Sequence, residues 1–216
     1  MNSKMLVLLA GLALSMAHAE TITVQVLDSE GGPVADAAVY AKPVAAMAAQ
    51  AKPQPIIIDQ IDKEFIKHLT VVQTGTAVSF PNHDKIRHHV YSFSAAKVFE
   101  LPLYAGIPPE PVVFDKVGAV ALGCNIHDWM SAYIYVVDSP YFAVTDQAGR
   151  AQLNVPASGG YVIGAWHRHL KGLQPRQPKI NVAAGGTAEL ALTMQLKRKS
   201  RPIRLPAGSG LAIGYR

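Results

Sequence analysis

The chain has 216 residues, half of them hydrophobic and 16% charged, with a formal net charge of +5. This length allows one domain or two small ones, and the apolar content excludes a disordered chain because it is sufficient for a packed core. The sequence contains a single cysteine, which excludes a fold stabilised by internal disulfides.

Residues 1–19 have the features of a secretory signal peptide. The stretch between Lys4 and Met16 is almost wholly apolar, and Ala17-His18-Ala19 provides the small residues that signal peptidase prefers before Glu20. The apolar stretch is about a dozen residues long, whereas a membrane-spanning helix needs about 20, so an uncleaved anchor is the less favoured alternative. We expect the protein to be exported to the periplasm and, after processing, not to be an integral membrane protein.

Residues 20–42 and 138–196 share a sequence pattern, in which short predicted strands with alternating apolar and polar residues are separated by turns. Residues 26–37 read Val-x-Asp-x-x-Gly-x-Pro-Val-x-Asp-Ala, and residues 145–161 contain Thr-Asp-x-x-Gly and Pro-x-x-Gly-Gly-Tyr. These motifs resemble carboxypeptidase-regulatory-like domains, whose transthyretin-like fold is a β-sandwich. The resemblance implies one sandwich that is interrupted in sequence by the residues between the two segments. The alternative is a single larger sandwich that uses all the strands.

The central part of the chain predicts a second set of strands. Residues 43–55 are rich in Pro, Ala and Gln and are expected to form a linker. Over residues 56–137, short apolar stretches alternate with turn formers such as Gly75, Pro81-Asn82 and Gly118, which is the pattern of a β-sandwich or barrel. The sequence has no amphipathic helical segment of the length that an α/β fold requires. The predicted fold class is therefore all-β.

Residues 197–216 are expected to form a basic, flexible tail. Much of the positive charge of the chain lies in Lys197-Arg198-Lys199, Arg201 and Arg204. A charge run of this kind is usually solvated. A nucleic-acid partner is not expected for an exported protein.

One short segment contains several candidate metal ligands. Residues 124–130, Cys-Asn-Ile-His-Asp-Trp-Met, place a thiolate, an imidazole and a thioether at the spacing C-x-x-H-x-x-M. We interpret this segment as a loop between two β-rich stretches that brings Cys124, His127 and Met130 to one point. A fourth ligand has to come from elsewhere in the chain, and the candidate is the histidine pair in residues 87–90, Arg-His-His-Val, at the entrance of a predicted strand.

These side-chain types indicate which metal the site would bind. One thiolate, two imidazoles and a weak axial thioether are the donors of a trigonal blue-copper site. Zinc prefers four strong N, S or O donors, and calcium or magnesium requires clustered oxygens. Copper also explains the lone cysteine, because a metal-bound thiolate is protected from oxidation and disulfide exchange. The sequence therefore predicts one type 1 copper ion per chain.

The segment from about Ile56 to Asp138 resembles the cupredoxins, which form a Greek-key β-sandwich. The similarity in loop spacing is greatest to amicyanin, whose final ligand loop is also C-x-x-H-x-x-M. Cupredoxins also carry the upstream pattern Gly-x-x-Val-x-aromatic-x-Asn, and their first histidine ligand lies eight residues beyond the aromatic residue. Residues 75–82 follow this pattern, and the eighth residue beyond Phe80 is His88. The same region is similar to exported cupredoxin-like proteins labelled methylamine utilization proteins.

The resemblance implies the ligands His88, Cys124, His127 and Met130. The residues after the first ligand are commonly Asn-Val in this family, whereas this chain has His89-Val90, so His89 is the alternative ligand. Strand alternation favours His88, since it places His88 and Val90 on one face. His89 replaces an asparagine that ties the two ligand loops together in cupredoxins, and Asn82 is a candidate for bracing the upstream turn; surface or packing roles are the alternatives for both.

A copper ion with these four ligands has no strong open coordination position, which suits one-electron transfer. We therefore expect a periplasmic electron carrier between a dehydrogenase and a c-type cytochrome or oxidase, with His127 near the surface. The sequence lacks the paired carboxylates or nucleophile–base pattern of an enzyme near the loop. Copper storage or delivery is the first alternative, although the three methionines after residue 19, Met47, Met130 and Met194, are dispersed. A structural adhesion module with a vestigial metal site is the second.

Overall fold

The structure is a computed structural model that describes residues 20–45, 52–108, 110–156, 158–172 and 177–197. The described residues form strands and turns without a helix, which confirms the all-β prediction. Among them there is accordingly no helix with the length and apolar character of a membrane span. The predicted signal peptide (1–19), part of the predicted linker (43–55) and nearly all of the predicted basic tail (197–216) lie outside the described residues.

The first of two sandwiches is built from both ends of the described chain. One of its sheets has the strand order β14-β1-β17, and the other has the order β13-β2-β15-β16. Its strands are β1 (Glu20–Asp28), β2 (Ala38–Pro43), β13 (Tyr141–Val144), β14 (Arg150–Val155), β15 (Gly159–Trp166), β16 (Lys179–Val182) and β17 (Thr187–Met194). Alternate residues of β1 point into its core, where Ile22, Val24 and Val26 are fully buried. That this sandwich is a carboxypeptidase-regulatory-like domain stays a prediction.

The second sandwich is formed by the central part of the chain. Its larger sheet has the order β6-β12-β11-β8-β9, and its smaller sheet has the order β10-β7-β3. The larger sheet contains β6 (Leu69–Gln73), β8 (His88–Ser94), β9 (Lys97–Tyr104), β11 (Gly118–Cys124) and β12 (His127–Val137). The smaller sheet contains β3 (Ile56–Ile57), β7 (Thr76–Ser79) and β10 (Val112–Phe114), and a separate short hairpin joins β4 (Gln60–Ile61) to β5 (Glu64–Phe65).

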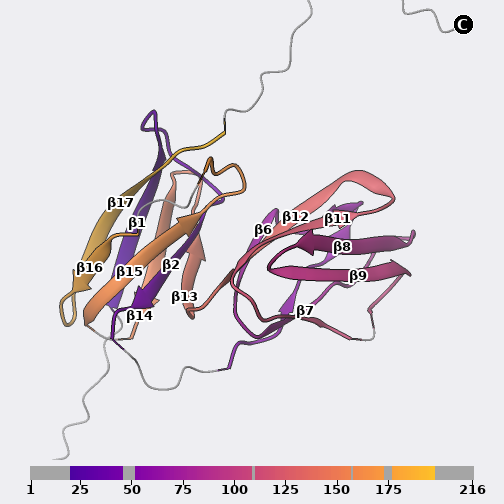
Figure 1. The fold of residues 1–216 in the computed structure, drawn as a ribbon, viewed down its shortest axis with the longest axis horizontal. Coiled ribbons are helices and arrows are strands. Elements are labelled where there is room, and N and C mark those ends of the chain that lie inside the picture. Colours follow the sequence, from indigo (N-terminus) through magenta and orange to yellow (C-terminus); the bar gives the residue numbers. More distant parts are fainter. Residues whose placement is uncertain (1–19, 46–51, 109, 157, 173–176, 198–216) are drawn as a thin grey trace, which may run out of the picture.

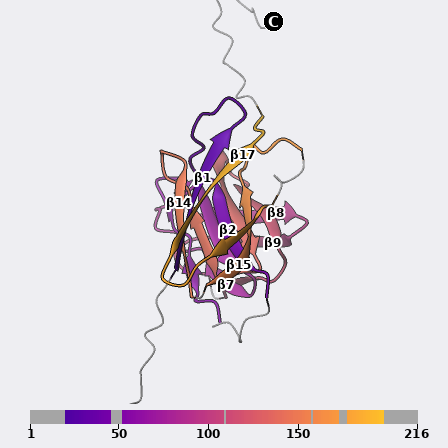
Figure 2. The ribbon, with the colours of Figure 1, turned by 90° about the vertical axis from the view of Figure 1, so that its left-hand side faces the viewer.

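The two sandwiches lie side by side and share an apolar interface (Figure 1). In Figure 2, which faces the first sandwich, β1 and β17 lie in front of the strands of the second sandwich. The rings of Tyr135 on β12 and Trp166 on β15 stack with centroids 4.9 Å apart and planes 6° apart. The buried residues of this interface cluster are Ala38, Tyr40, Leu69, Val71, Tyr135 and Val137.

Close packing at this interface also explains a glycine. Gly164 on β15 is paired with Tyr40 on β2. A Cβ atom at Gly164 would lie 2.1 Å from Cζ of the Tyr40 ring, so no larger residue fits beneath that ring without displacing it. The absence of a side chain at this position lets Tyr40 lie against the backbone of β15 within the shared cluster.

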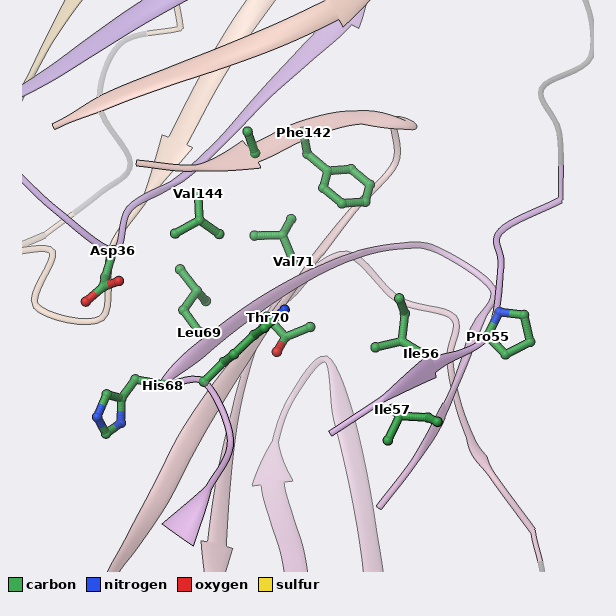
Figure 3. Close-up of a pocket in the computed structure, with 12 residues that line it drawn as sticks. Asp36, Pro55, Ile56, Ile57, His68, Leu69, Thr70, Val71, Phe142 and Val144 are labelled. Atoms are coloured by element: carbon green, nitrogen blue, oxygen red, sulfur yellow. The ribbon is translucent and has the colours of Figure 1, made fainter. Parts of the chain in front are cut away.

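An open groove of about 800 Å³ lies beside this interface. Figure 3 shows Phe142 and Val144 of β13 on one side, Leu69 and Val71 of β6 on the other, and Ile56 at the far end of the groove. β6 and β13 are edge strands of their sheets. The groove therefore marks the line along which the edges of the two sandwiches meet.

Replacement of Tyr135 by alanine is expected to lower the free energy of unfolding by about 3 kcal/mol or more, because truncation of a buried aromatic side chain leaves a cavity. Tyr135 is 2% exposed and packs against residues of both sandwiches. Phe93→Ala is the matched control, since Phe93 is 76% exposed and its loss should change stability by about 0.5 kcal/mol or less. Chemical denaturation of both variants checks this, and equal losses would show that the interface contributes little to stability.

Candidate metal centre

Three side chains from three strand ends meet in the second sandwich. His88 is the first residue of β8, Cys124 the last of β11 and His127 the first of β12. The Sγ atom of Cys124 lies 3.7 Å from Nδ1 of His88 and 3.7 Å from Nδ1 of His127. One donor atom from each residue lies within 4.8 Å of the other two, and among the described residues this is the group of His, Cys and acidic side chains suited to hold a metal ion.

The local backbone differs from the loop that the sequence suggested. Cys124 and His127 face each other as paired residues of the β11–β12 hairpin, with Asn125-Ile126 as the turn. The register of β11 against β12 shifts at this point, as in a β-bulge: Gly123 pairs with Ser131, whereas the next residue, Cys124, pairs with His127. A bulge redirects side chains locally. The C-x-x-H spacing therefore works as a tight hairpin, in which both donors are fixed by strand pairing.

The two sulfur–nitrogen distances fit a trigonal metal ion. Metal–nitrogen bonds of about 2.0 Å and metal–sulfur bonds of about 2.3 Å are typical of divalent transition metals bound to His and Cys. Two such donors that are 3.7 Å apart reach one ion when the angle at the ion is close to about 120°. A trigonal His₂Cys set is the arrangement of blue-copper sites. The residues present therefore fit copper.

Met130, the predicted axial ligand, lies in the same buried cluster as the thiol. Met130 is 1% exposed and Cys124 is 4% exposed, and both belong to the core of the second sandwich. On β12 Met130 shares its face with Ala132 and Ile134, which also point into this core. The structure thus places Met130 in the same core as Cys124, and its ligation of copper stays a prediction.

The structure distinguishes the two adjacent histidines. His88 is fully buried, as is Val90, so these two residues share the inner face of β8. His89 points to the other face, where its Nε2 lies 2.8 Å from Oε1 of Glu100. The backbone carbonyl of His89 accepts a hydrogen bond of 3.2 Å from the amide of Asn125. The link between the two ligand segments is therefore made by the backbone of His89, while its imidazole pairs with Glu100.

Asn82 connects the turn before β8 to a neighbouring segment. Its side-chain amide donates to the carbonyl oxygens of Ile86 and Tyr104 over 2.9 and 3.0 Å, and its Oδ1 accepts from the amide of Asp84 over 2.9 Å. Asn82 is 3% exposed. These bonds hold the turn that leads to His88, and a role of Asn82 around the metal stays a prediction.

Asp84 was not predicted as a site residue, yet it contacts a candidate ligand directly. Its Oδ2 lies 2.7 Å from Nε2 of His88. Burial tends to raise the pKa of the Asp84 carboxyl, but hydrogen bonds from His88 and from the backbone amides of Lys63 and Asp62 hold this pKa below its usual value. The carboxyl group is therefore ionised at neutral pH. In the sequence, the one hint of this contact is the position of Asp84, four residues before His88.

His127 is the most exposed of the three side chains that meet at the site. Burial, followed by smaller electrostatic effects of His88 and Lys63, lowers the pKa of His127 despite the opposing charge of Asp84. The imidazole is thereby favoured in the neutral form that binds metal. The ring of Trp129 lies 5.1 Å from that of His127, and Trp129 is 64% exposed. Ile126, in the turn, is 46% exposed, so apolar side chains border His127 on the protein surface.

No protein-family model and no curated protein matches the chain. Among solved structures, the chain is similar to a copper-containing nitrite reductase from Thermus scotoductus SA-01, with 24% identity and a TM-score of 0.37 over 44% of this chain and 25% of that chain. A purple cupredoxin from Nitrosopumilus maritimus matches with 22% identity and a TM-score of 0.33, over 38% of this chain and 96% of that chain.

A reduced Cu(I) form of an amicyanin variant matches with 18% identity and a TM-score of 0.35, over 47% of this chain and 99% of that chain. The match thus spans about a quarter of the nitrite reductase but nearly the whole of the small cupredoxins. The case for a metal rests on the side chains of this chain.

Proposed function

We propose that the protein is a copper-binding, one-electron carrier of the type 1 class. The observation that carries this proposal is the meeting of His88, Cys124 and His127, in which both Sγ–Nδ1 distances are 3.7 Å, a separation that two donors of a trigonal copper ion can span. A bound copper ion supplies a one-electron couple between Cu(I) and Cu(II). The side chains of the chain bind the ion, shield it and connect it to the surface.

The arrangement of the donors suits electron transfer because strand pairing and hydrogen bonds hold them in place. His88 is fully buried and held by Asp84, while Cys124 is held by the β11–β12 pairing. Little rearrangement is then needed when the charge of the ion changes. The burial of Cys124 keeps oxidants and other thiols from the sulfur. His127, which is partly exposed, is the group through which electrons would enter or leave.

The surface around His127 supports a transient redox partner. Ile126 and Trp129 are exposed apolar residues beside this histidine. Small exposed apolar areas are typical of sites where proteins meet briefly. A periplasmic location, with a dehydrogenase as the electron donor and a c-type cytochrome or oxidase as the acceptor, is part of this proposal and follows from the predicted signal peptide and the type of site.

The proposal is tested by adding Cu(II) to the protein without residues 1–19. We expect one copper ion per chain and an intense visible absorption band, because charge transfer from the Cys124 thiolate to Cu(II) gives such a band. The band should vanish on chemical reduction and return on oxidation. A copper complex without this band would contradict the proposed carrier.

Copper delivery is distinguished from electron transfer by adding a chelator to the Cu(I)-loaded protein. A delivery protein would bind Cu(I) in preference and pass it rapidly to an acceptor chelator. The buried thiol and the buried His88 oppose fast release. We therefore expect Cu(I) to be retained for much longer than the mixing time when a chelator is added. Release within the mixing time would favour delivery over electron transfer.

A further inference from the structure

The contact between Asp84 and His88 is buried and direct. The side chains of His88 and Asp84 are 0% and 12% exposed, and Nε2 of His88 lies 2.7 Å from Oδ2 of Asp84. Because an ionised carboxylate can only accept hydrogen bonds, the hydrogen of this bond belongs to Nε2. In the neutral imidazole the lone pair is then on Nδ1, the atom that faces Sγ of Cys124. Asp84 thereby fixes the tautomer that binding through Nδ1 requires.

Asp84 is itself held in place by the neighbouring hairpin. Its Oδ1 accepts from the backbone amide of Asp62 over 2.7 Å, and its Oδ2 accepts from that of Lys63 over 2.8 Å. Asp62 and Lys63 form the β4–β5 turn with φ values of 56° and 61°, a left-handed conformation that few non-glycine residues adopt. The carboxylate therefore connects this turn to His88, and neither oxygen is free to rotate away from the imidazole.

A carboxylate on the far nitrogen of an imidazole changes its properties as a ligand. It fixes the orientation of the ring and makes the other nitrogen a stronger donor. Its negative charge would lie on the far side of the His88 ring from a bound ion, and because His88 is shielded from solvent the interaction would be weakly screened. Both effects stabilise the more highly charged ion, Cu(II), more than Cu(I). They therefore lower the reduction potential.

We propose that Asp84 is a positioning residue that orients His88 and sets the reduction potential of the copper site through this buried hydrogen bond. The inference rests on the proposed function, because a potential exists only if copper is bound. It deepens that function by assigning the tuning of the couple to a residue outside the four predicted ligands. The proposal also holds that Asp84 orients His88 in the metal-free protein.

The test uses two substitutions that each remove one negative charge. Asp84→Asn removes the carboxylate that contacts His88, whereas Asp128→Asn removes an exposed carboxylate that lies between His127 and Trp129 in the sequence. For Asp84→Asn we expect the ratio of Cu(II) to Cu(I) affinity to fall at least ten-fold, which raises the potential by about 59 mV for one electron. The shift for Asp128→Asn should be much smaller because its charge is solvated. Equal shifts would show that only the overall charge matters and would overturn the proposal.

A second measurement needs no variant and no copper. Nitrogen-15 NMR of the metal-free protein should show His88 protonated at Nε2 and unprotonated at Nδ1. A hydrogen on Nδ1 would overturn the role of Asp84, whether or not copper binds. Conversely, the expected tautomer without any visible band on copper addition would reject the proposed function while the contact itself stands. If the unmodified protein and Asp84→Asn both show the band and have the same reduction potential, only the role of Asp84 in setting the potential is rejected.

Discussion

Replacement of Cys124 by serine is expected to abolish the intense visible band of the copper-loaded protein. The band needs a thiolate bound to Cu(II), and Cys124 is the single cysteine of the chain. We also expect the affinity for copper to fall by at least about ten-fold, because a hydroxyl is a much poorer donor for this ion than a soft thiolate. Optical titration with Cu(II), alongside total copper per chain, measures both effects.

The control for this variant is Met130→Leu, a change of nearly equal volume in the same core. It removes the thioether but leaves Cys124, His88 and His127, so a visible band should remain while the reduction potential changes. Far-ultraviolet circular dichroism should show the same strand content in both variants. A Cys124→Ser protein that keeps the band would mean that the band does not arise from a copper-bound thiolate of this chain.

Separate replacement of His88 and His89 by glutamine is expected to give opposite results, although the two residues are adjacent. His88→Gln should lose the visible band, because Nδ1 of His88 is one of the two imidazole nitrogens that lie 3.7 Å from the thiol. His89→Gln should keep the band, since the imidazole of His89 lies on the other face of β8 and pairs with Glu100. Absorption spectra of both copper-loaded variants check this pair.

The two glutamine variants control for each other, because they make the same substitution at adjacent positions. Their unfolding in the metal-free state should be compared, because His88 is fully buried and its replacement also disturbs the core. If the metal-free His88→Gln protein is folded and colourless with copper, the effect lies in the ligand set. Loss of the band in His89→Gln alone would identify His89 as the ligand.

The fold class and the outline of the site were accessible from the sequence because both depend on short-range patterns. Period-two alternation and frequent turn formers predicted an all-β chain, which the structure confirms. The same alternation placed His88 and Val90 on one face, and both are buried. Copper ligation by His88, Cys124, His127 and Met130 stays a prediction, although the structure brings the first three together.

Other features depended on contacts that no local pattern encodes. β9, an edge strand whose residues alternate between partly buried and exposed, has few strong signals of its own and was not predicted. The tight β11–β12 hairpin was interpreted as a loop, because the sequence does not show a register shift at Gly123. Asp84 was missed because its importance comes from a hydrogen bond to His88 and from two amides of a distant turn.

The longest strand of the described chain connects the site to the shared interface. Along β12, Met130, Ala132, Ile134 and Val136 point into the core of the second sandwich, whereas Tyr133, Tyr135 and Val137 face the first sandwich. A one-residue insertion or deletion in this strand would exchange these two sets. It would thus remove the thioether side chain from the core and the stacking tyrosine from the interface at once. The number of residues between Met130 and Tyr135 is therefore constrained from both faces of β12.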